Sequence, residues 1–182
     1  MTTSETTRSP RRERMGASLE EPGMREFLAF DVASETFALP LSCVREIMRV
    51  PSVTPVPRAP SEVLGIVSVR GQVTTLIDLR QRLNVEVAPI TTRTRVLLVD
   101  QGDEILGLLC DRVKQVHRLS ETEVEIASVL GSDASSYVMG IGRPGQRKGE
   151  AQRDGKGAAA SGEAEVLILL DPIALLKRQS HA

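Results

Sequence analysis

Aromatic residues are scarce in this chain of 182 residues: Phe, Trp and Tyr together make up 2% of it, and Trp is absent. A hydrophobic core built from this composition must be aliphatic. Val and Ile are branched at Cβ and are enriched in strands, so this bias favours β-structure. The scarcity also argues against a single-stranded nucleic-acid platform, which needs exposed rings on which bases can stack.

An excess of charge of one sign is also missing. The chain has 23 Lys and Arg residues against 24 Asp and Glu residues, which gives a net charge of -1. It therefore lacks the broad basic field of a nucleic-acid-binding protein. No apolar run approaches the length of a membrane span, and the polar first residues predict no signal peptide. We expect a cytoplasmic protein.

Metal-ligating and nucleophilic side chains are few. The histidines are His117 and His181, and Cys43 and Cys110 lack CxxC spacing, so we expect no metal site. Both cysteines lie in apolar runs, which predicts buried free thiols rather than a disulfide. The alternative, a nucleophilic pair of Cys110 and His117, requires the two side chains to meet; a buried Cys and a strand His explain the residues more simply.

Candidate catalytic carboxylates all stand where an apolar strand ends. They are Asp78, Asp100, Asp111 and Asp171. Paired-carboxylate catalysis remains open for them, but their positions favour capping of the next element. Gly140 and Gly142 are not followed by a helix start that could receive a phosphate. We therefore expect neither an enzyme nor a bound cofactor.

The strongest local signal present is a hairpin at residues 62–80. Two β-rich runs flank Arg70 and Gly71, and Gly71 can take the positive φ that a tight turn needs. Asp78 is predicted to cap a short helix over residues 79–83. The hairpin thus holds one arginine on a stiff support.

Short strands with intervening turns are predicted along most of the remaining chain. We expect them at residues 26–32, 36–39, 95–99, 104–111, 113–119, 137–142 and 165–170, with a short helix from Pro172. The continuous apolar run 96–99 predicts a strand buried on both faces. With no βαβ rhythm, the sequence predicts an all-β barrel or sandwich.

Two segments near the N-terminal half break the strand pattern. Prolines between Pro51 and Pro60 exclude a helix and predict an extended, irregular segment. A short helical stripe is predicted just before it, because apolar residues recur there at helical spacing: Leu41, Val44, Ile47 and Met48.

Changes in composition divide the chain into a folded unit and its flanks. Residues 1–24 contain few apolar side chains and are predicted to form a disordered tail. Residues 143–164, rich in Gly, Lys, Arg and Ala, are predicted to be a flexible insert in the hairpin of strands 137–142 and 165–170. The folded unit is then residues 25–178, and 179–182 form a second tail.

Several motifs, taken together and in order, resemble the CheW family of chemotaxis coupling proteins. In the first half they are Phe27–Phe30, Phe37–Leu41, Val44–Ile47, Thr54–Pro60, Val63–Val67, Val69–Gly71 and Leu76–Arg80. In the second half they are Gly107–Val113, Tyr137–Gly142 and Val166–Asp171. The resemblance covers residues 26 to 178.

The resemblance implies two packed five-stranded SH3-like β-barrels with a few short helices and no catalysis. Proteins of this family bridge the cytoplasmic tip of methyl-accepting chemoreceptors and the regulatory domain of a chemotaxis histidine kinase. The receptor tip lies in an apolar groove between the barrels. We therefore expect a cytoplasmic adaptor at chemoreceptor clusters, with no cofactor, no direct membrane insertion and no nucleic-acid partner.

Four residues are candidates for receptor or kinase contact. Val44 and Glu46 match the family's functional Val and Glu, and Arg70 matches its hairpin arginine. We expect Arg70 to pair with Glu46 beside the groove and to fix the receptor-contact surface; two ordinary solvated charges are the other interpretation. Leu41 and Val44 are groove candidates, although plain core packing would also explain them.

Departures from the family pattern leave two further functions open. The insert 143–164 is longer than is typical, Ser68-Val69 replaces Asn-Leu, and Thr75 stands where Pro is frequent. If the insert lies on a kinase-facing surface, the protein would bind receptors without engaging the kinase. The alternative from a different class is a small barrel that binds nucleic acid.

Overall fold

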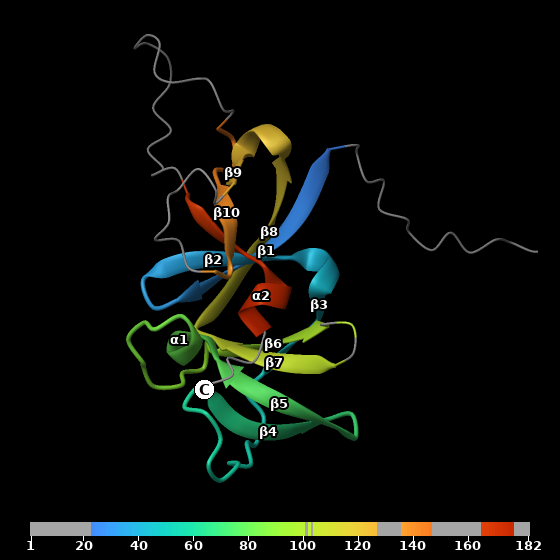
Figure 1. Ribbon diagram of the computed structural model, residues 1–182, viewed down its shortest axis with the longest axis vertical. Helices are drawn as coiled ribbons and strands as arrows, with labels where there is room; N and C mark the ends of the chain where they lie inside the picture. The colour runs from blue at the N-terminus through green and yellow to red at the C-terminus, as the bar shows by residue number, and fades with distance from the viewer. Residues whose placement is uncertain (1–22, 101, 103, 127–135, 147–164, 177–182) are drawn as a thin grey trace, which may run out of the picture.

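The structure is a computed structural model that describes residues 23–100, 102, 104–126, 136–146 and 165–176. Within these ranges the chain forms eleven β-strands, two short α-helices and two 3₁₀ turns. The strands belong to two sheets, which lie one above the other in Figure 1. The predicted all-β class is confirmed.

The first sheet has six strands in the order β8-β1-β2-β11-β10-β9. β1 pairs antiparallel with both β2 and β8, and β11 pairs parallel with β2. The predicted hairpin of residues 137–142 and 165–170 is present as the antiparallel pair β10 and β11. The strands are β1 (Met24–Val32), β2 (Glu35–Pro40), β8 (Arg112–Ser120), β9 (Val124–Ile126), β10 (Val138–Gly142) and β11 (Leu167–Leu170).

The second sheet has five strands in the order β3-β6-β7-β5-β4. β4 and β5 form the predicted hairpin, and β5 pairs parallel with β7. The strands are β3 (Val44–Arg49), β4 (Val63–Val69), β5 (Gln72–Asp78), β6 (Arg95–Asp100) and β7 (Ile105–Cys110). Helix α1 (Leu79–Arg82) follows β5 and helix α2 (Pro172–Leu176) follows β11. None of the helices in the described ranges is long and apolar enough to cross a membrane.

Each sheet encloses an aliphatic core of its own, and the period of two along a strand explains how. On β6, Val96 and Leu98 pack in the core of the second sheet, whereas Leu97 and Val99 face a different cluster. β6 is therefore buried on both faces, as its continuous apolar run predicted. Phe27 belongs to the corresponding core of the first sheet.

A third and larger core joins the two sheets. Phe30 and Leu39 from the first sheet and Leu108 from the second are fully buried in it, and α2 adds Leu175 and Leu176. In Figure 1, α2 accordingly lies between the two sheets. Burying apolar area on both sides of the junction stabilises the two halves as one packed body.

The predicted helical stripe over residues 41–48 is wrong. Residues Leu41–Cys43 form a 3₁₀ turn, and β3 follows directly with alternating exposure. Val44 pairs with Val99 and Glu46 with Leu98, so one residue on β3 is extra at this β-bulge. The sequence imitates a helix here because Ile47, on the exposed side of β3, is apolar like the half-buried Val44 and Met48.

Other differences between sequence and structure are small. β9 was not predicted, because a strand of three residues gives little periodic signal. Asp78 caps α1 as expected, since its carboxylate accepts from the backbone N–H of Arg80 at 2.9 Å. The predicted tail 1–24, the insert 143–164 and the tail 179–182 lie outside the described residues, apart from 23–24 and 143–146.

Candidate functional site

The turn between β4 and β5 has an unusual backbone. Arg70 and Gly71 both have positive φ angles, 51° and 84°. A two-residue turn of this kind twists with its strands, and it favours Asn, Asp or Gly because other side chains are strained there. Gly71 was expected at positive φ, but Arg70 was not. The turn geometry therefore gives no reason for an arginine at this position.

The predicted pairing of Arg70 with Glu46 is present. Arg70 Nη2 lies 3.0 Å from Glu46 Oε2, with 80% of the arginine side chain and 34% of the glutamate side chain exposed. β3 and β4 are the two edge strands of the second sheet, so the ion pair connects opposite edges. An exposed pair of this kind contributes at most about 1 kcal/mol. Its effect is mainly to orient the two side chains.

The bulge in β3 divides the candidate residues between two faces. Val44 lies opposite Val99 and packs against the core between the sheets. Glu46 lies opposite Leu98, whose side chain belongs to the core of the second sheet. The structure therefore brings Glu46 together with Arg70, but it does not gather all the candidates on one face.

Leu41 and Val44 lie at the rim of the core between the sheets. Both are half-buried and pack against that core. Their exposed portions are available to a partner, while their buried portions support the junction. Both sequence interpretations, groove contact and core packing, are compatible with this placement, so their role in binding stays a prediction.

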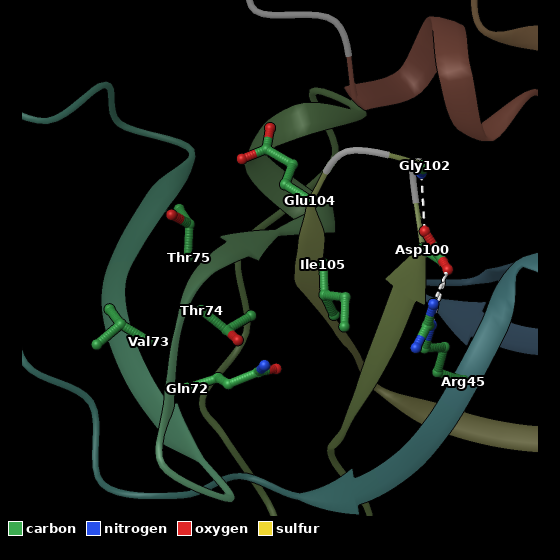
Figure 2. Close-up of a pocket in the computed structure, with 9 residues that line it drawn as sticks. All are labelled: Arg45, Gln72, Val73, Thr74, Thr75, Asp100, Gly102, Glu104 and Ile105. Atoms are coloured by element: carbon green, nitrogen blue, oxygen red, sulfur yellow. Dashed lines mark hydrogen bonds and ion pairs between the residues drawn. The ribbon is translucent and has the colours of Figure 1, made fainter.

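A polar depression lies beside the start of β5, just after the turn that carries Arg70 (Figure 2). It lies between β3, β5, the end of β6 and the start of β7. The residues that line it are Arg45, Gln72, Val73, Thr74, Thr75, Asp100, Gly102, Glu104 and Ile105. Arg45 and Gln72 are close chain neighbours of Glu46 and Arg70. Sequence reasoning missed this depression, because its walls come from four separate strands.

Asp100 organises one wall of the depression. Its carboxylate accepts from the backbone N–H of Gly102 at 2.7 Å and from Nε of Arg45 at 2.7 Å (Figure 2). The hydrogen bond from Gly102 and then that from Arg45 lower the pKa of this carboxyl below its ordinary value. Asp100 is thus held ionised at neutral pH as a structural acceptor rather than as a proton donor.

The remaining aspartates also have structural partners. Asp171 accepts from the backbone N–H of Ile173 at 2.8 Å at the start of α2, as the capping prediction required. Asp111 accepts from the buried Arg80, with Nε 2.8 Å away, and from the backbone N–H of Ala33 at 2.7 Å. Each of the four candidate aspartates therefore has a structural hydrogen-bond partner.

Cys110 and His117 do not form the nucleophilic pair that was considered. The Cys110 thiol is buried and contacts the carbonyl oxygen of Arg95 at 3.7 Å, and burial raises its pKa to about 12. Such a thiol stays protonated and unreactive at neutral pH. Nε2 of His117 instead lies 3.4 Å from Oε2 of Glu165. Both cysteines are free, and the described residues contain no group of three or more potential metal ligands.

Comparison with known proteins connects this chain and its fold to one family. A family model described as the CheW-like domain matches residues 26–180. The chain is 31% identical over 122 residues to the chemotaxis protein CheW of Helicobacter pylori, covering 67% of this chain and 74% of that protein. It is 32% identical over 120 residues to the chemotaxis protein CheW of Rhizobium meliloti, and the match covers 65% of this chain and 77% of that protein.

A solved structure supports the fold independently. The crystal structure of the scaffolding protein TtCheW from Thermoanaerobacter tengcongensis superposes with a TM-score of 0.68. The match covers 85% of this chain and 93% of that one, at 21% sequence identity. At this identity the likeness concerns the arrangement of the two sheets.

Proposed function

The chain belongs to the CheW-like family, and we propose that it is a non-enzymatic adaptor that couples the cytoplasmic tips of chemoreceptors to a chemotaxis histidine kinase in a signalling array. The observation that carries this proposal is the family match over residues 26–180, which includes both sheets. The two relatives described above are themselves named chemotaxis proteins. The place of action is then the cytoplasmic face of chemoreceptor clusters.

The two-sheet architecture suits an adaptor. A coupling protein needs separate contact surfaces that are held in a fixed relation to each other. The core between the sheets, with Phe30, Leu39 and Leu108 fully buried, provides that relation. The described side chains also favour binding over chemistry, since the four candidate aspartates accept structural hydrogen bonds and the Cys110 thiol is buried.

The receptor-contact surface is proposed to include Leu41, Val44, Glu46 and Arg70. Arg70 and Glu46 orient each other at 3.0 Å, which supports a defined polar contact at the end of the second sheet. Leu41 and Val44 supply half-buried apolar area at the rim of the junction. The bulge in β3 places Val44 and Glu46 on different faces of the strand. A partner that contacts all four residues must therefore extend around this edge strand.

A co-purification experiment tests the adaptor function. The full chain is mixed with a soluble chemoreceptor tip fragment and, separately, with the regulatory domain of a chemotaxis kinase. We expect both fragments to be retained, and Arg70→Ala to reduce retention of the receptor fragment. Arg118→Ala, at an exposed ion pair of the first sheet, is the control and should leave retention unchanged.

The same experiment separates the adaptor from its closest alternative. Retention of the receptor fragment without the kinase domain would support an adaptor that does not engage the kinase. In that case, deletion of residues 144–163 shows whether the insert is the obstacle. Retention of neither fragment would overturn the proposed function.

Nucleic-acid binding gains no support from the structure. The chain contains three phenylalanines, Phe27, Phe30 and Phe37, and each is at most 4% exposed. They are therefore unavailable as platforms on which bases could stack.

A further inference from the structure

Three arginines line one open pocket at the junction of the two sheets. Arg93 lies in the turn before β6, Arg95 begins β6 in the second sheet, and Arg112 begins β8 in the first sheet. Val113 completes the lining and packs against the core between the sheets. Arg95 and Asp100 are the two ends of β6, so this pocket lies at the opposite end of that strand from the depression of Figure 2.

None of the three arginines forms an ion pair with a carboxylate of the described residues, although Asp31 on β1 is the cross-strand partner of Arg112. The ion pairs found there use other cations: Arg45, Arg70, Arg80, Arg82, Lys114, His117, Arg118 and Arg143. Nη1 of Arg95 donates to the carbonyl oxygens of Thr92 and Thr94, at 2.8 Å each. These bonds hold the side chain in place, and no carboxylate of the described residues lies within ion-pair distance of it.

The neighbouring strand adds another positive charge. Arg49 is the cross-strand partner of Arg95 in the pairing of β3 with β6, and it forms no ion pair with the described residues. Like charges directly opposite each other destabilise a sheet. The net charge of -1 shows that this concentration of arginine does not follow from an excess of basic residues. An acidic ligand would relieve the repulsion.

We propose that the Arg93–Arg95–Arg112 pocket binds the carboxylate groups of an acidic segment of a protein partner. The planar guanidinium group matches a carboxylate with two parallel hydrogen bonds. Arg93 and Arg112 are exposed, and single pairs in water are weak, so one small anion would be held poorly. A segment with several carboxylates engages the arginines together, and its binding strengthens with each linked contact. This surface is additional to the proposed receptor contact and independent of it.

Fluorescence anisotropy with a defined probe tests this assignment. The full chain is titrated into a labelled peptide of alternating Glu and Ala, at low ionic strength where screening is weak. The matched probe replaces Glu by Gln. We expect the Glu peptide to bind and the Gln peptide not to. The double variant R93Q/R112Q should weaken binding of the Glu peptide about tenfold, as two exposed charge pairs allow.

The control variant removes the same charge elsewhere. R25Q/R58Q replaces two exposed arginines outside the pocket and should leave affinity within about twofold, since remote exposed charges act weakly. Arg95 is kept in both variants because it supports the turn before β6. Equal thermal melting curves would establish that both variants are folded.

Three results would overturn the proposal. One is an equal loss of affinity in both double variants, which would indicate a general effect of charge. Another is equal binding of the Gln peptide. The third is displacement of the Glu peptide by inorganic phosphate far more effectively than by chloride at the same ionic strength, which would assign the pocket to a small anion instead.

Discussion

At the scale of single residues, Arg70 combines a strained backbone with an exposed ion pair. The positive φ of 51° costs a non-glycine residue about 1 kcal/mol. The pair with Glu46 offsets only part of this, since Arg70 is 80% exposed. An arginine is thus retained at a position where glycine would be more stable. This is the pattern expected of a residue kept for a contact with a partner.

Replacing Arg70 by glycine should separate stability from binding. Arg70→Gly is expected to raise the free energy of unfolding by up to about 1 kcal/mol, because the turn is no longer strained. Retention of the receptor fragment should fall as it does for Arg70→Ala. Urea unfolding and co-purification measure the two effects. A marked loss of stability in Arg70→Gly would show instead that the arginine side chain supports the turn.

The buried thiol of Cys110 predicts a loss of stability at alkaline pH. Burial raises its pKa from 9.0 to about 12 in the folded protein. The folded state therefore keeps its proton where the unfolded state releases it. This contribution is fully present below about pH 9 and is lost as the pH rises toward 12. Urea unfolding measures this loss of stability. The experiment covers about pH 8 to pH 11, because this range begins below the pKa of the unfolded thiol and approaches that of the folded one.

Cys110→Ala provides the comparison. At neutral pH this variant should be less stable because it leaves a small cavity, but its stability should fall less steeply above pH 9, where the unfolded parent protein begins to release the thiol proton. Cys43 remains in both proteins and cancels in the comparison. Identical slopes for the two proteins would contradict a buried, protonated Cys110.

At the scale of elements, short connections tie the sheets together through α1. Arg80 in α1 is 3% exposed and pairs with Asp111, which stands between β7 and β8. The same carboxylate accepts from the backbone N–H of Ala33 in the turn between β1 and β2. Asp111 therefore links α1, the end of the second sheet and the first hairpin of the first sheet.

Asp111→Ala should be strongly destabilising. It leaves the buried guanidinium of Arg80 without its counter-charge, a change that costs about 3 kcal/mol or more. The exposed pair of Arg118 and Glu26 gives the control, since Glu26→Ala should cost less than about 1 kcal/mol. Urea unfolding of both variants tests the contrast. Similar costs would mean that Arg80 finds another acceptor.

Elements with a regular period and a clear turn could be predicted from the sequence. The hairpins, the doubly buried β6 and the caps at Asp78 and Asp171 depend on local chemistry. β3 was misread because its exposed residue Ile47 is apolar, and the strand with which it pairs lies more than forty residues away along the chain. The pairing of Glu46 with Arg70 was expected from the family resemblance. The arginine pocket was not, because tertiary packing alone brings its residues together.

At the scale of the whole molecule, the core between the sheets determines how the protein unfolds. Leu108 is fully buried there, and Leu108→Ala should lower the free energy of unfolding by about 2–5 kcal/mol. Because both sheets share this core, one cooperative transition is expected rather than two. Tyr137, the single tyrosine in the chain, packs against the shared core and reports on it by fluorescence.

Far-ultraviolet circular dichroism reports on all strands at once. Coincident transitions by circular dichroism and tyrosine fluorescence, in both the parent protein and Leu108→Ala, would confirm that the two sheets unfold together. A first transition seen by circular dichroism alone would show that one sheet can unfold while the shared core persists.

The three aliphatic cores, arranged in series, also have a mechanical consequence. Close-packed protein interiors are poorly compressible. The spacing between the outer ends of the two sheets is therefore set by side-chain volumes and changes little under load. In the proposed array, such a stiff component would help to set the distance between the partners that it contacts.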